Sequence, residues 1–383
     1  MNQRERFLAL YDYKPVDRTP IWDFGFWSET LVEWKKQGLP ESAEPDDFFG
    51  MDKQWQWGPY NYGLLPAFER KVLEDNPDFE VILGADGVIA RQPKDFTSMP
   101  DFIGHTLKDR ASWEEHYKWR LNPDTPGRIG PEFYERCKQF KNRDYPAIIH
   151  CGSVLGSIRN WFGLENFSYI QFDDPKLFAE IVETAGNCIA VTLERALTEA
   201  RKLGVTFDMG HFWEDICYNH GPLVHPKTFN ELAVPQIKRI TDVGRKYGIN
   251  LFSVDCDGKV DELILPWRKA GLQMMFPLEV GDWADPVELR QRFGKELLMM
   301  GGVDKRVLAR SRKDIDAMID HLTPLVNQGA FLPTPDHRVP PTVSLENYIY
   351  YLNRIKKVWG RDLPDVRPTG QPKKAAKKTA KKK

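Results

Sequence analysis

Short apolar runs alternate with longer amphipathic segments through the second half of the chain. The apolar runs lie at 146–152, 205–210, 250–255, 274–279, 297–304 and 330–337. We expect each run to be a strand, and several are apolar throughout, as are strands buried on both faces of a sheet. The segments between them have apolar residues three and four positions apart, which is typical of helices.

Helices are expected at 175–203, 225–248, 260–271, 285–294, within 305–328 and at 344–360. Asp285 and Ser344 are fitting N-caps for the helices that follow them, and Gly204 ends the first helix. Pro235 should kink or interrupt the second helix, because proline lacks the backbone N–H that a helix interior needs.

Alternating strands and helices predict a parallel sheet covered by helices. A closed eight-stranded TIM barrel and an open doubly wound sheet both satisfy this pattern. The sequence has no GxGxxG after a first strand and no GxxxxGK[ST], which weakens the nucleotide-binding alternatives. We therefore favour an α/β fold with a single TIM (β/α)8 barrel.

Charge separates the end of the chain from the rest. Hydrophobic residues make up 41% of the 383 residues, enough for a large core. The formal net charge is −1, but seven lysines lie between Lys373 and Lys383, which leaves −8 for residues 1–372. We expect residues 1–362 to form the barrel with N-terminal additions, and 363–383 to be a disordered basic tail. This balance predicts no specific nucleic-acid partner.

The five cysteines are odd in number, widely spaced and without a CxxC pair. We therefore expect no disulfide framework, and we expect a reducing, cytoplasmic location. The opening MNQRERFLAL is no signal peptide, and no apolar run is long enough to span a membrane.

Six expected strands end in titratable side chains. These are His150 and Cys151, Asp208 and His211, Asp255 to Asp257, Glu279, Asp304, and Asp336 and His337. Active sites of parallel barrels lie at the carboxyl ends of the strands. Crowding carboxylates together is costly unless cations, protons or hydrogen-bond donors compensate. The pattern therefore predicts an active-site mouth that holds a metal ion or a cationic intermediate.

Several stretches carry a resemblance to a known family. They are GINLFSVDCDGKVDELILPWRKAGLQMMFPLEV, FGKELLMMGGVDKRVLA, GAFLPTPDHRVPPTVSLENYIYYL, the upstream HFWEDICYNHGPLVHPKTFNE and the N-terminal VDRTPIWDFGFWSETLVEW. Over nearly all of residues 3–360 the chain resembles the uroporphyrinogen decarboxylase superfamily, and most of all its methyltransferase-like branch. The resemblance implies a single TIM barrel, and a homodimer is expected because family members often pair.

The methyltransferase branch moves methyl groups between a substrate or thiol and a corrinoid carrier, using zinc held by a His-x-Cys pair and a later Cys. In this chain Asp255 and Asp257 stand at the His and Cys positions, and His337 stands at the later Cys. Two carboxylates and one imidazole bind zinc but also suit harder metals. The resemblance thus implies a divalent metal at Asp255, Asp257 and His337, with the corrinoid supplied by a partner protein. Alternatively, these carboxylates bond loop amides or bind the substrate directly.

The leading hypothesis is transfer of a methyl group from a small methylated or methoxylated compound to a corrinoid carrier. The alternative is a uroporphyrinogen decarboxylase-type carboxy-lyase acting on a tetrapyrrole, with Asp257 stabilising a cationic pyrrole intermediate. Decarboxylases carry an RQAGR segment near the N-terminus, whereas this chain has WDFGFWSETLVEW there, with Asp23 and Glu29. A barrel that only binds a tetrapyrrole or corrinoid is a third possibility.

Individual roles follow from these hypotheses. The candidate catalytic residues are Asp257, Glu279, His337 and Glu214, of which Asp257, Glu279 and His337 are also able to supply acid–base chemistry without a metal. The candidate substrate-binding residues are Asp23, Trp27, Asp208, His211 and Asp215. Aromatic residues of the N-terminal segment would wall the pocket.

Overall fold

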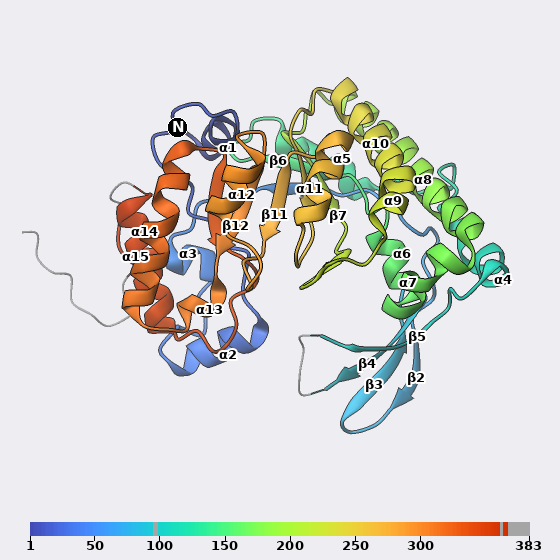
Figure 1. Ribbon diagram of the computed structural model, residues 1–383, viewed down its shortest axis with the longest axis horizontal. Coiled ribbons are helices and arrows are strands. Elements are labelled where there is room, and N and C mark those ends of the chain that lie inside the picture. The colour runs from blue at the N-terminus through green and yellow to red at the C-terminus, as the bar shows by residue number, and fades with distance from the viewer. Residues whose placement is uncertain (95–98, 361–362, 367–383) are drawn as a thin grey trace, which may run out of the picture.

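Seven parallel strands form a curled sheet at the centre of the computed structural model, which describes residues 1–94, 99–360 and 363–366 (Figure 1). In sheet order they are β1 (Gln56–Gly58), β6 (Ala147–His150), β7 (Met209–Trp213), β10 (Phe252–Asp255), β11 (Met274–Leu278), β12 (Leu298–Val303) and β13 (Phe331–Pro335). Their order in the sheet follows their order in the chain, as in a TIM barrel.

An extended segment, residues 21–27, occupies the eighth position of the ring. On one side Phe26 pairs in parallel with Val339, just after β13, and the N–H of Val339 donates to the carbonyl of Gly25 at 3.0 Å. On the other side the N–H of Asp52, just before β1, donates to the carbonyl of Ile21 at 3.0 Å. The predicted TIM barrel is therefore confirmed, with seven regular strands and one irregular member.

Side chains from around the ring pack together inside it. Trp22 contacts Trp55 with 5.5 Å between ring centroids, and Trp55 lies 5.5 Å from Phe276 of β11. The helix α1 (Gln3–Tyr11) adds Phe7, whose ring stacks on Trp22 at 5.4 Å. These contacts fill the interior at the amino end of the strands, so the barrel is a packed core rather than a pore.

The α1 helix is also hydrogen-bonded to the last strands. The carbonyl of Leu10 accepts the N–H of Ala330, next to β13, at 3.0 Å. The hydroxyl of Tyr11 donates to the carbonyl of Met299 in β12 at 3.3 Å. The first helix of the chain thus closes the barrel floor against its last two strands.

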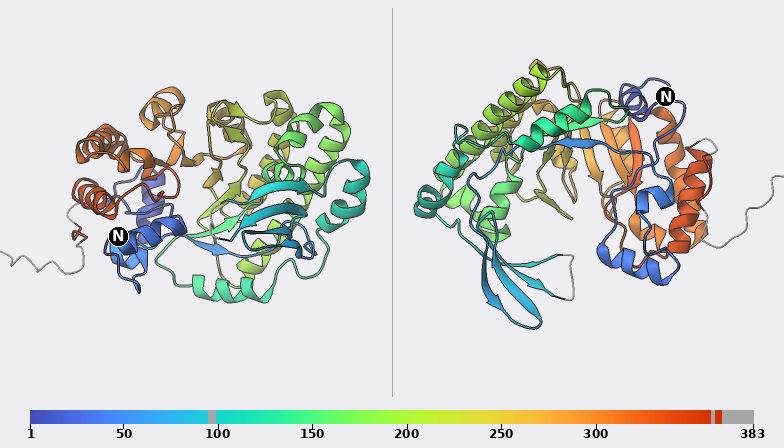
Figure 2. Two further views of the ribbon diagram at one scale, coloured as in Figure 1. Left: turned by 90° about the horizontal axis from the view of Figure 1, so that it is seen from below. Right: turned by 180° about the vertical axis from the view of Figure 1, so that it is seen from behind.

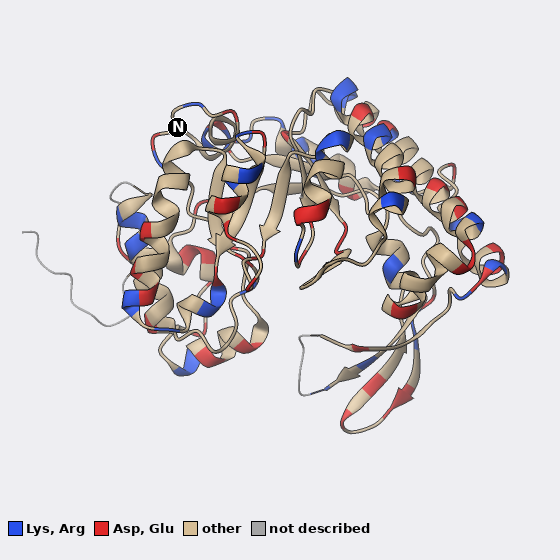
Figure 3. Cartoon of the chain, in the orientation of Figure 1, with Lys and Arg blue, Asp and Glu red and all other residues tan. Residues whose placement is uncertain are grey.

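Helices cover the outer face of the sheet (Figures 1 and 2). They include α5 (Pro131–Phe140), α8 (Pro175–Lys202), α10 (Val234–Lys246), α11 (Asp261–Ala270), α12 (Pro286–Phe293), α14 (Arg312–Gln328) and α15 (Leu345–Val358). The N-caps expected at Asp285 and Ser344 are confirmed, since each side chain accepts a backbone N–H of the first turn. Basic and acidic residues intermix along these helices (Figure 3).

Pro235 interrupts the helix expected over 225–248. That segment divides into α9 (Pro226–Thr228), a π-helical turn (Phe229–Ala233) and α10, which has Pro235 in its first turn. The backbone stays helical through Thr228, Ala233 and Val234, so the interruption is a change from α-helical to π-helical hydrogen bonding just before Pro235, which has no N–H to donate. The prediction of an interruption is confirmed.

The strand expected at 205–210 lies further along the chain, as β7 (Met209–Trp213). Asp208 therefore precedes the strand and lies at its amino end, away from the barrel mouth, so its assignment to the substrate site is wrong. Its buried carboxylate pairs with Arg4 at 2.8 Å and with Arg143 at 2.9 Å, and it accepts the N–H of Ala147 at 2.9 Å. The apolar residues Val205 and Phe207 shifted the expected strand towards the N-terminus.

The N-terminal additions include α2 (Ser28–Lys36), α3 (Pro45–Phe49) and an antiparallel sheet that stands away from the barrel (Figures 1 and 2). In order, the sheet comprises β2 (Lys71–Asp75), β3 (Phe79–Leu83), β4 (Val88–Pro93) and β5 (Asp101–His105). All five residues of β2 are exposed. The sequence pattern does not specify this sheet, because strands such as KVLED have no buried face to produce an apolar alternation.

The C-terminal boundary differs slightly from the expected one. The backbone of Val366 exchanges two hydrogen bonds with the Asn353 side chain of α15, at 2.6 and 3.0 Å, and the Val366 side chain is buried. The packed domain therefore extends at least four residues beyond 362. The lysine-rich part of the predicted tail, from residue 367 on, lies outside the described residues.

All five cysteines are free and buried, which agrees with the expected lack of a disulfide framework. Among the described residues, none of the helices has the length and apolar character needed to cross a lipid bilayer.

Replacing Asp208 by Asn should destabilise the fold by about 3–5 kcal/mol, because the buried Arg143 guanidinium loses its counter-charge. Urea unfolding followed by circular dichroism measures this. The matched control is Asp242→Asn in the exposed Lys238–Asp242 pair, which should cost no more than about 1 kcal/mol. Equal effects of the two substitutions would contradict a structural role for Asp208.

Candidate active site

The carboxyl ends of the parallel strands gather acidic side chains at one mouth of the barrel. Asp255 is the last residue of β10, and Asp257 follows two positions later. Asp215 follows β7, which pairs with β10 in parallel, so its backbone runs beside Asp255. The N–H of Asp215 points to the carbonyl of Asp255 at 3.4 Å.

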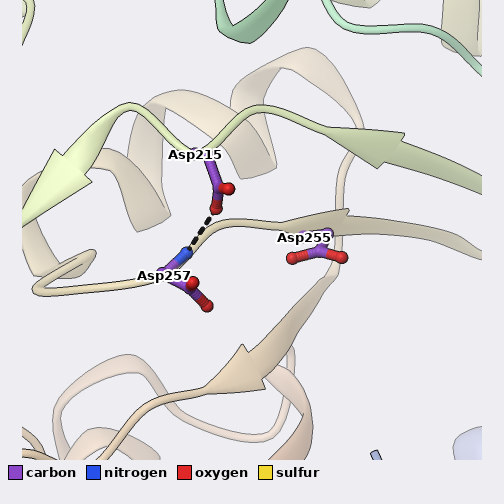
Figure 4. Close-up of side chains that lie close together, drawn as sticks. All are labelled: Asp215, Asp255 and Asp257. Atoms are coloured by element: carbon purple, nitrogen blue, oxygen red, sulfur yellow. Dashed lines mark hydrogen bonds between the residues drawn. The ribbon is translucent and has the colours of Figure 1, made fainter. Parts of the chain in front are cut away.

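Three of these carboxylates form a cluster, Asp215, Asp255 and Asp257 (Figure 4). One carboxylate oxygen from each lies within 4.8 Å of the others. Asp215 has a φ of +45°, in the left-handed region that non-glycine residues seldom adopt. This turn directs its side chain towards Asp257, whose N–H donates to Asp215 Oδ1 at 2.9 Å.

Two carboxyl groups of the cluster, Asp255 and Asp215, hold protons more tightly than ordinary carboxyl groups do. Burial, followed by the charge of Asp257, raises the pKa of Asp255 to about 8. The same two causes raise the pKa of Asp215 to about 6. Positive charge placed among the three side chains would relieve this crowding, because like charges in a partly desolvated site repel strongly.

His337 faces the cluster from the loop after β13. Its Nε2 lies 3.5 Å from Asp257 Oδ2. Burial disfavours the imidazolium, but the hydrogen bond and charge of Asp257 outweigh burial and raise the pKa of His337. The ring packs on Phe24 and Trp27, with centroids 4.9 and 5.8 Å apart. An imidazolium held in this way is able to donate a proton into the mouth.

Glu279, Asp336 and Lys305 form a second group, in which the charges pair with one another and the carboxylates also accept backbone N–H groups. Lys305 Nζ lies 2.9 Å from Glu279 and 3.6 Å from Asp336. Glu279 also accepts the N–H of Gly258 at 3.0 Å, and Asp336 accepts the N–H groups of Val280 and Lys305, each at 3.0 Å. These carboxylates therefore tie the loops after β10, β11 and β12 together, and Lys305 is a member that the sequence reasoning missed.

His211 lies deeper, on β7. Its Nδ1 is 2.7 Å from the Ser253 hydroxyl, and its Nε2 is 3.8 Å from Asp255. Burial lowers the pKa of His211 to about 3, so the ring is neutral at physiological pH. His150 of β6 lies 6.0 Å away, and burial lowers its pKa to about 3 as well. Two neutral imidazoles thus lie beneath the acidic cluster.

Glu214 is turned away from the mouth, which contradicts its candidate role in orienting the reacting group. The side chain is fully buried, and its oxygens accept the N–H groups of Val154, Leu155 and Gly156 at 2.7, 2.8 and 3.1 Å. Burial raises the pKa of Glu214 to about 7, against the opposing effect of these three donors. The residue anchors the start of α6 (Gly156–Phe162).

Asp23 is likewise buried and directed away from the mouth. Its carboxylate accepts the hydroxyl of Tyr348 on α15 and the N–H of Gly25. Burial raises its pKa to about 7. These contacts brace residues 21–27 against α15, so the assignment of Asp23 to the substrate site is wrong.

A cavity of about 580 Å³ opens over the acidic cluster. Its polar lining comes from the three aspartates, His337 and Arg338, and its aromatic lining from Phe24, Phe26, Trp27 and Trp213. Trp27 therefore lies where the sequence placed it. Arg338 and Trp213 were missed, although each directly neighbours a strand-end residue that the sequence did identify.

The cluster fits a divalent cation. Oxygen ligands of one hard cation lie at most about 4–5 Å apart, twice the metal–oxygen distance, and the cluster meets this condition at 4.8 Å. Zinc also accepts an imidazole nitrogen as a ligand. Of the three residues predicted as ligands, Asp255 and Asp257 belong to the cluster and Asp215 joins them, whereas His337 lies beside Asp257 and outside the set of atoms within 4.8 Å of one another.

Comparisons with known proteins agree with this architecture. A family model described as Uroporphyrinogen decarboxylase (URO-D) matches residues 132–358. A uroporphyrinogen decarboxylase from Magnetococcus marinus is 20% identical over 365 residues, covering 88% of this chain and 94% of that protein. A solved methyltransferase from Methanosarcina mazei superposes with a TM-score of 0.57 at 14% identity, covering 93% of this chain and 98% of that one. The last likeness shows a shared fold.

Asp23 should make stability depend on pH. An ordinary aspartate ionises near pH 4, so between about pH 4 and 7 the folded protein holds a proton that the unfolded chain has released. The free energy of unfolding therefore falls as the pH rises through this window. Asp23→Asn lacks this pH dependence. Its free energy of unfolding should therefore rise relative to that of the wild type, by on the order of 1–4 kcal/mol between pH 4.5 and 8.

Urea unfolding at both pH values measures this difference. The exposed variant Asp12→Asn should follow the wild type at each pH. An Asp23→Asn curve parallel to the wild type would show that Asp23 is ionised throughout.

Proposed function

The chain belongs to the uroporphyrinogen decarboxylase family, and we propose that it is a methyltransferase within that family. It would move a methyl group from a small methylated or methoxylated compound to a corrinoid carried by a partner protein. The cluster of Asp215, Asp255 and Asp257 facing His337 carries this proposal, because it lies at the strand ends where the related branch holds its metal. The likeness of fold to the Methanosarcina mazei methyltransferase supports it further.

The three aspartates would hold a divalent cation, and His337 beside them would stay outside its coordination sphere. When bound, such a cation supplies a Lewis acid that polarises the atom carrying the methyl group. Trp27 and Phe24 would hold the apolar body of the substrate and keep water from the reacting atoms.

His337 would supply the proton that the reaction needs. In demethylation the bond from oxygen or nitrogen to the methyl carbon breaks, and the methyl group passes to the corrinoid. The oxygen or nitrogen keeps the electron pair and takes up a proton. Asp257 keeps His337 in its protonated form, so that a donor is present beside the cluster.

The decarboxylase alternative has less support from the residues of the mouth. A porphyrinogen carries many carboxylates and needs cationic partners. Arg18, near the N-terminal segment, is committed to a part-buried ion pair with Asp52. Three carboxylates line the cavity against one arginine, Arg338, and would repel a tetrapyrrole that carries many carboxylates.

The purified protein should bind about one divalent cation per chain, and Asp255→Asn and Asp257→Asn should lose most of it. Mass spectrometry of the metal content after incubation with zinc, manganese or iron measures this. Asp282→Asn, at an exposed site, is the matched control and should keep the metal. A wild type that stays metal-free with all three ions would leave the carboxylates to act on the substrate directly.

Methyl transfer itself can be followed with free cob(I)alamin in place of the carrier, by the absorbance of methylcobalamin. We expect turnover of methoxylated aromatic compounds or methylamines, and a fall of about 10²- to 10⁴-fold in kcat for His337→Ala. His321→Ala, on the outer helix α14, should leave kcat unchanged. Release of carbon dioxide from uroporphyrinogen, with no methyl transfer to cobalamin, would favour the decarboxylase instead.

A further inference from the structure

Arg159 of α6 lies beside the acidic cluster with its charge incompletely satisfied. Its side chain is 22% exposed, and within the described residues the buried Nε has no hydrogen-bond partner. The nearest ion-pair contact, from Nη2 to Asp215 Oδ2, is 3.9 Å, too long for a hydrogen bond. A partly desolvated guanidinium in this state is costly, because burying a donor without an acceptor forfeits its bonds to water.

A second cavity begins at Arg159. It has a volume of about 490 Å³ and lies between α6 and the antiparallel sheet, with His105 and Phe102 in its lining. Met99 lines both this cavity and the one over the acidic cluster. Arg159 itself lines the second cavity, and its 3.9 Å contact with Asp215, which lines the first, places it between the two.

Other charged groups of the second cavity already have partners. Asp101 pairs with Arg91 at 3.7 Å, and Asp86 accepts the N–H of Val88 at 3.2 Å. His105 Nδ1 bonds the carbonyl of Asn160 at 3.0 Å. Among the described residues of this lining, Arg159 is the one arginine or lysine, so it is the group that can offer a permanent positive charge to a ligand.

Two neighbouring residues, Glu214 and Trp213, position the Arg159 guanidinium. Glu214 anchors the first turn of α6, and the Arg159 guanidinium carbon lies 5.6 Å from the centroid of the Trp213 ring. A guanidinium held by an aromatic face presents a rigid fork that matches a carboxylate. A guanidinium placed in this way is able to bind an anion in the second cavity.

We propose that Arg159 binds a carboxylate of the methyl donor. The substrate would be an aromatic carboxylate with a methoxy group, whose ring lies between Trp213 and Trp27 and whose methoxy group reaches the acidic cluster. The inference rests on the proposed function for the identity of the reacting group. The positive charge of Arg159 would offset the single carboxylate of such a compound beside a mouth lined by three aspartates.

A measurement of ligand binding without methyl transfer tests the anion site at Arg159 separately from the proposed methyltransferase activity. The probes are the three isomers of methoxybenzoate and the matching methoxybenzamides, measured by isothermal titration calorimetry without any corrinoid and in the presence of manganese. At least one acid should bind the wild type about 10- to 100-fold more tightly than its amide. Arg159→Gln should abolish that preference, and Arg159→Lys should restore part of it, because lysine keeps the charge but lacks the fork.

Arg239→Gln on α10, an exposed change of equal charge, is the control and should keep the preference. The proposal is overturned if no acid binds the wild type more tightly than its amide does, or if Arg159→Gln still binds an acid more tightly than its amide. It is also overturned if Arg338→Gln, at the other end of the mouth, removes the preference while Arg159→Gln does not. Tight acid binding that depends on Arg159, with no methyl transfer to cobalamin, would uphold the anion site and refute the methyltransferase.

Discussion

The mouth of this barrel depends on one buried carboxylate. Glu214 accepts three consecutive N–H groups at the start of α6, and so joins the end of β7 to the loop that follows β6. Its successor, Asp215, takes a left-handed conformation and turns into the mouth, while Arg159 extends from the helix that Glu214 anchors. Gly156 permits this approach, since a Cβ there would lie 2.1 Å from the Glu214 carbonyl oxygen.

The acidic residues of the mouth divide into two electrostatic classes. Glu279 and Asp336 share Lys305 and several backbone donors, which is how a fold stabilises partly buried carboxylates. Asp215 and Asp255 have no such lysine, and burial, followed by the charge of Asp257, raises the pKa of each. Arg159 approaches Asp215 only to 3.9 Å, so the protein's own groups compensate this cluster only in part, and a cation or a substrate would contribute most there.

Much of the barrel could be predicted from the sequence, because buried parallel strands leave continuous apolar runs and a polar residue at each end. Asp255, Asp257 and His337 were found in this way. Asp208 and Glu214 could not be assigned correctly, since a shift of a few residues moves a side chain to the other end of a strand or away from the mouth. Arg159 lies inside a helix, where its sequence neighbours give no sign that it faces a cavity.

The packing of α1 against the last strands affects the order in which the chain folds. The Leu10 carbonyl is hydrogen-bonded to Ala330 and the Tyr11 hydroxyl to Met299. These two contacts of the first helix can form only after some 290 to 320 further residues have been synthesised. During synthesis Phe7 can pack on Trp22 early, but Leu10 and Tyr11 lack their partners until the ribosome has made β12 and the residues next to β13. Contacts this distant along the chain slow folding, since the loop between them must be ordered first. The barrel floor should therefore be among the last parts of the molecule to form.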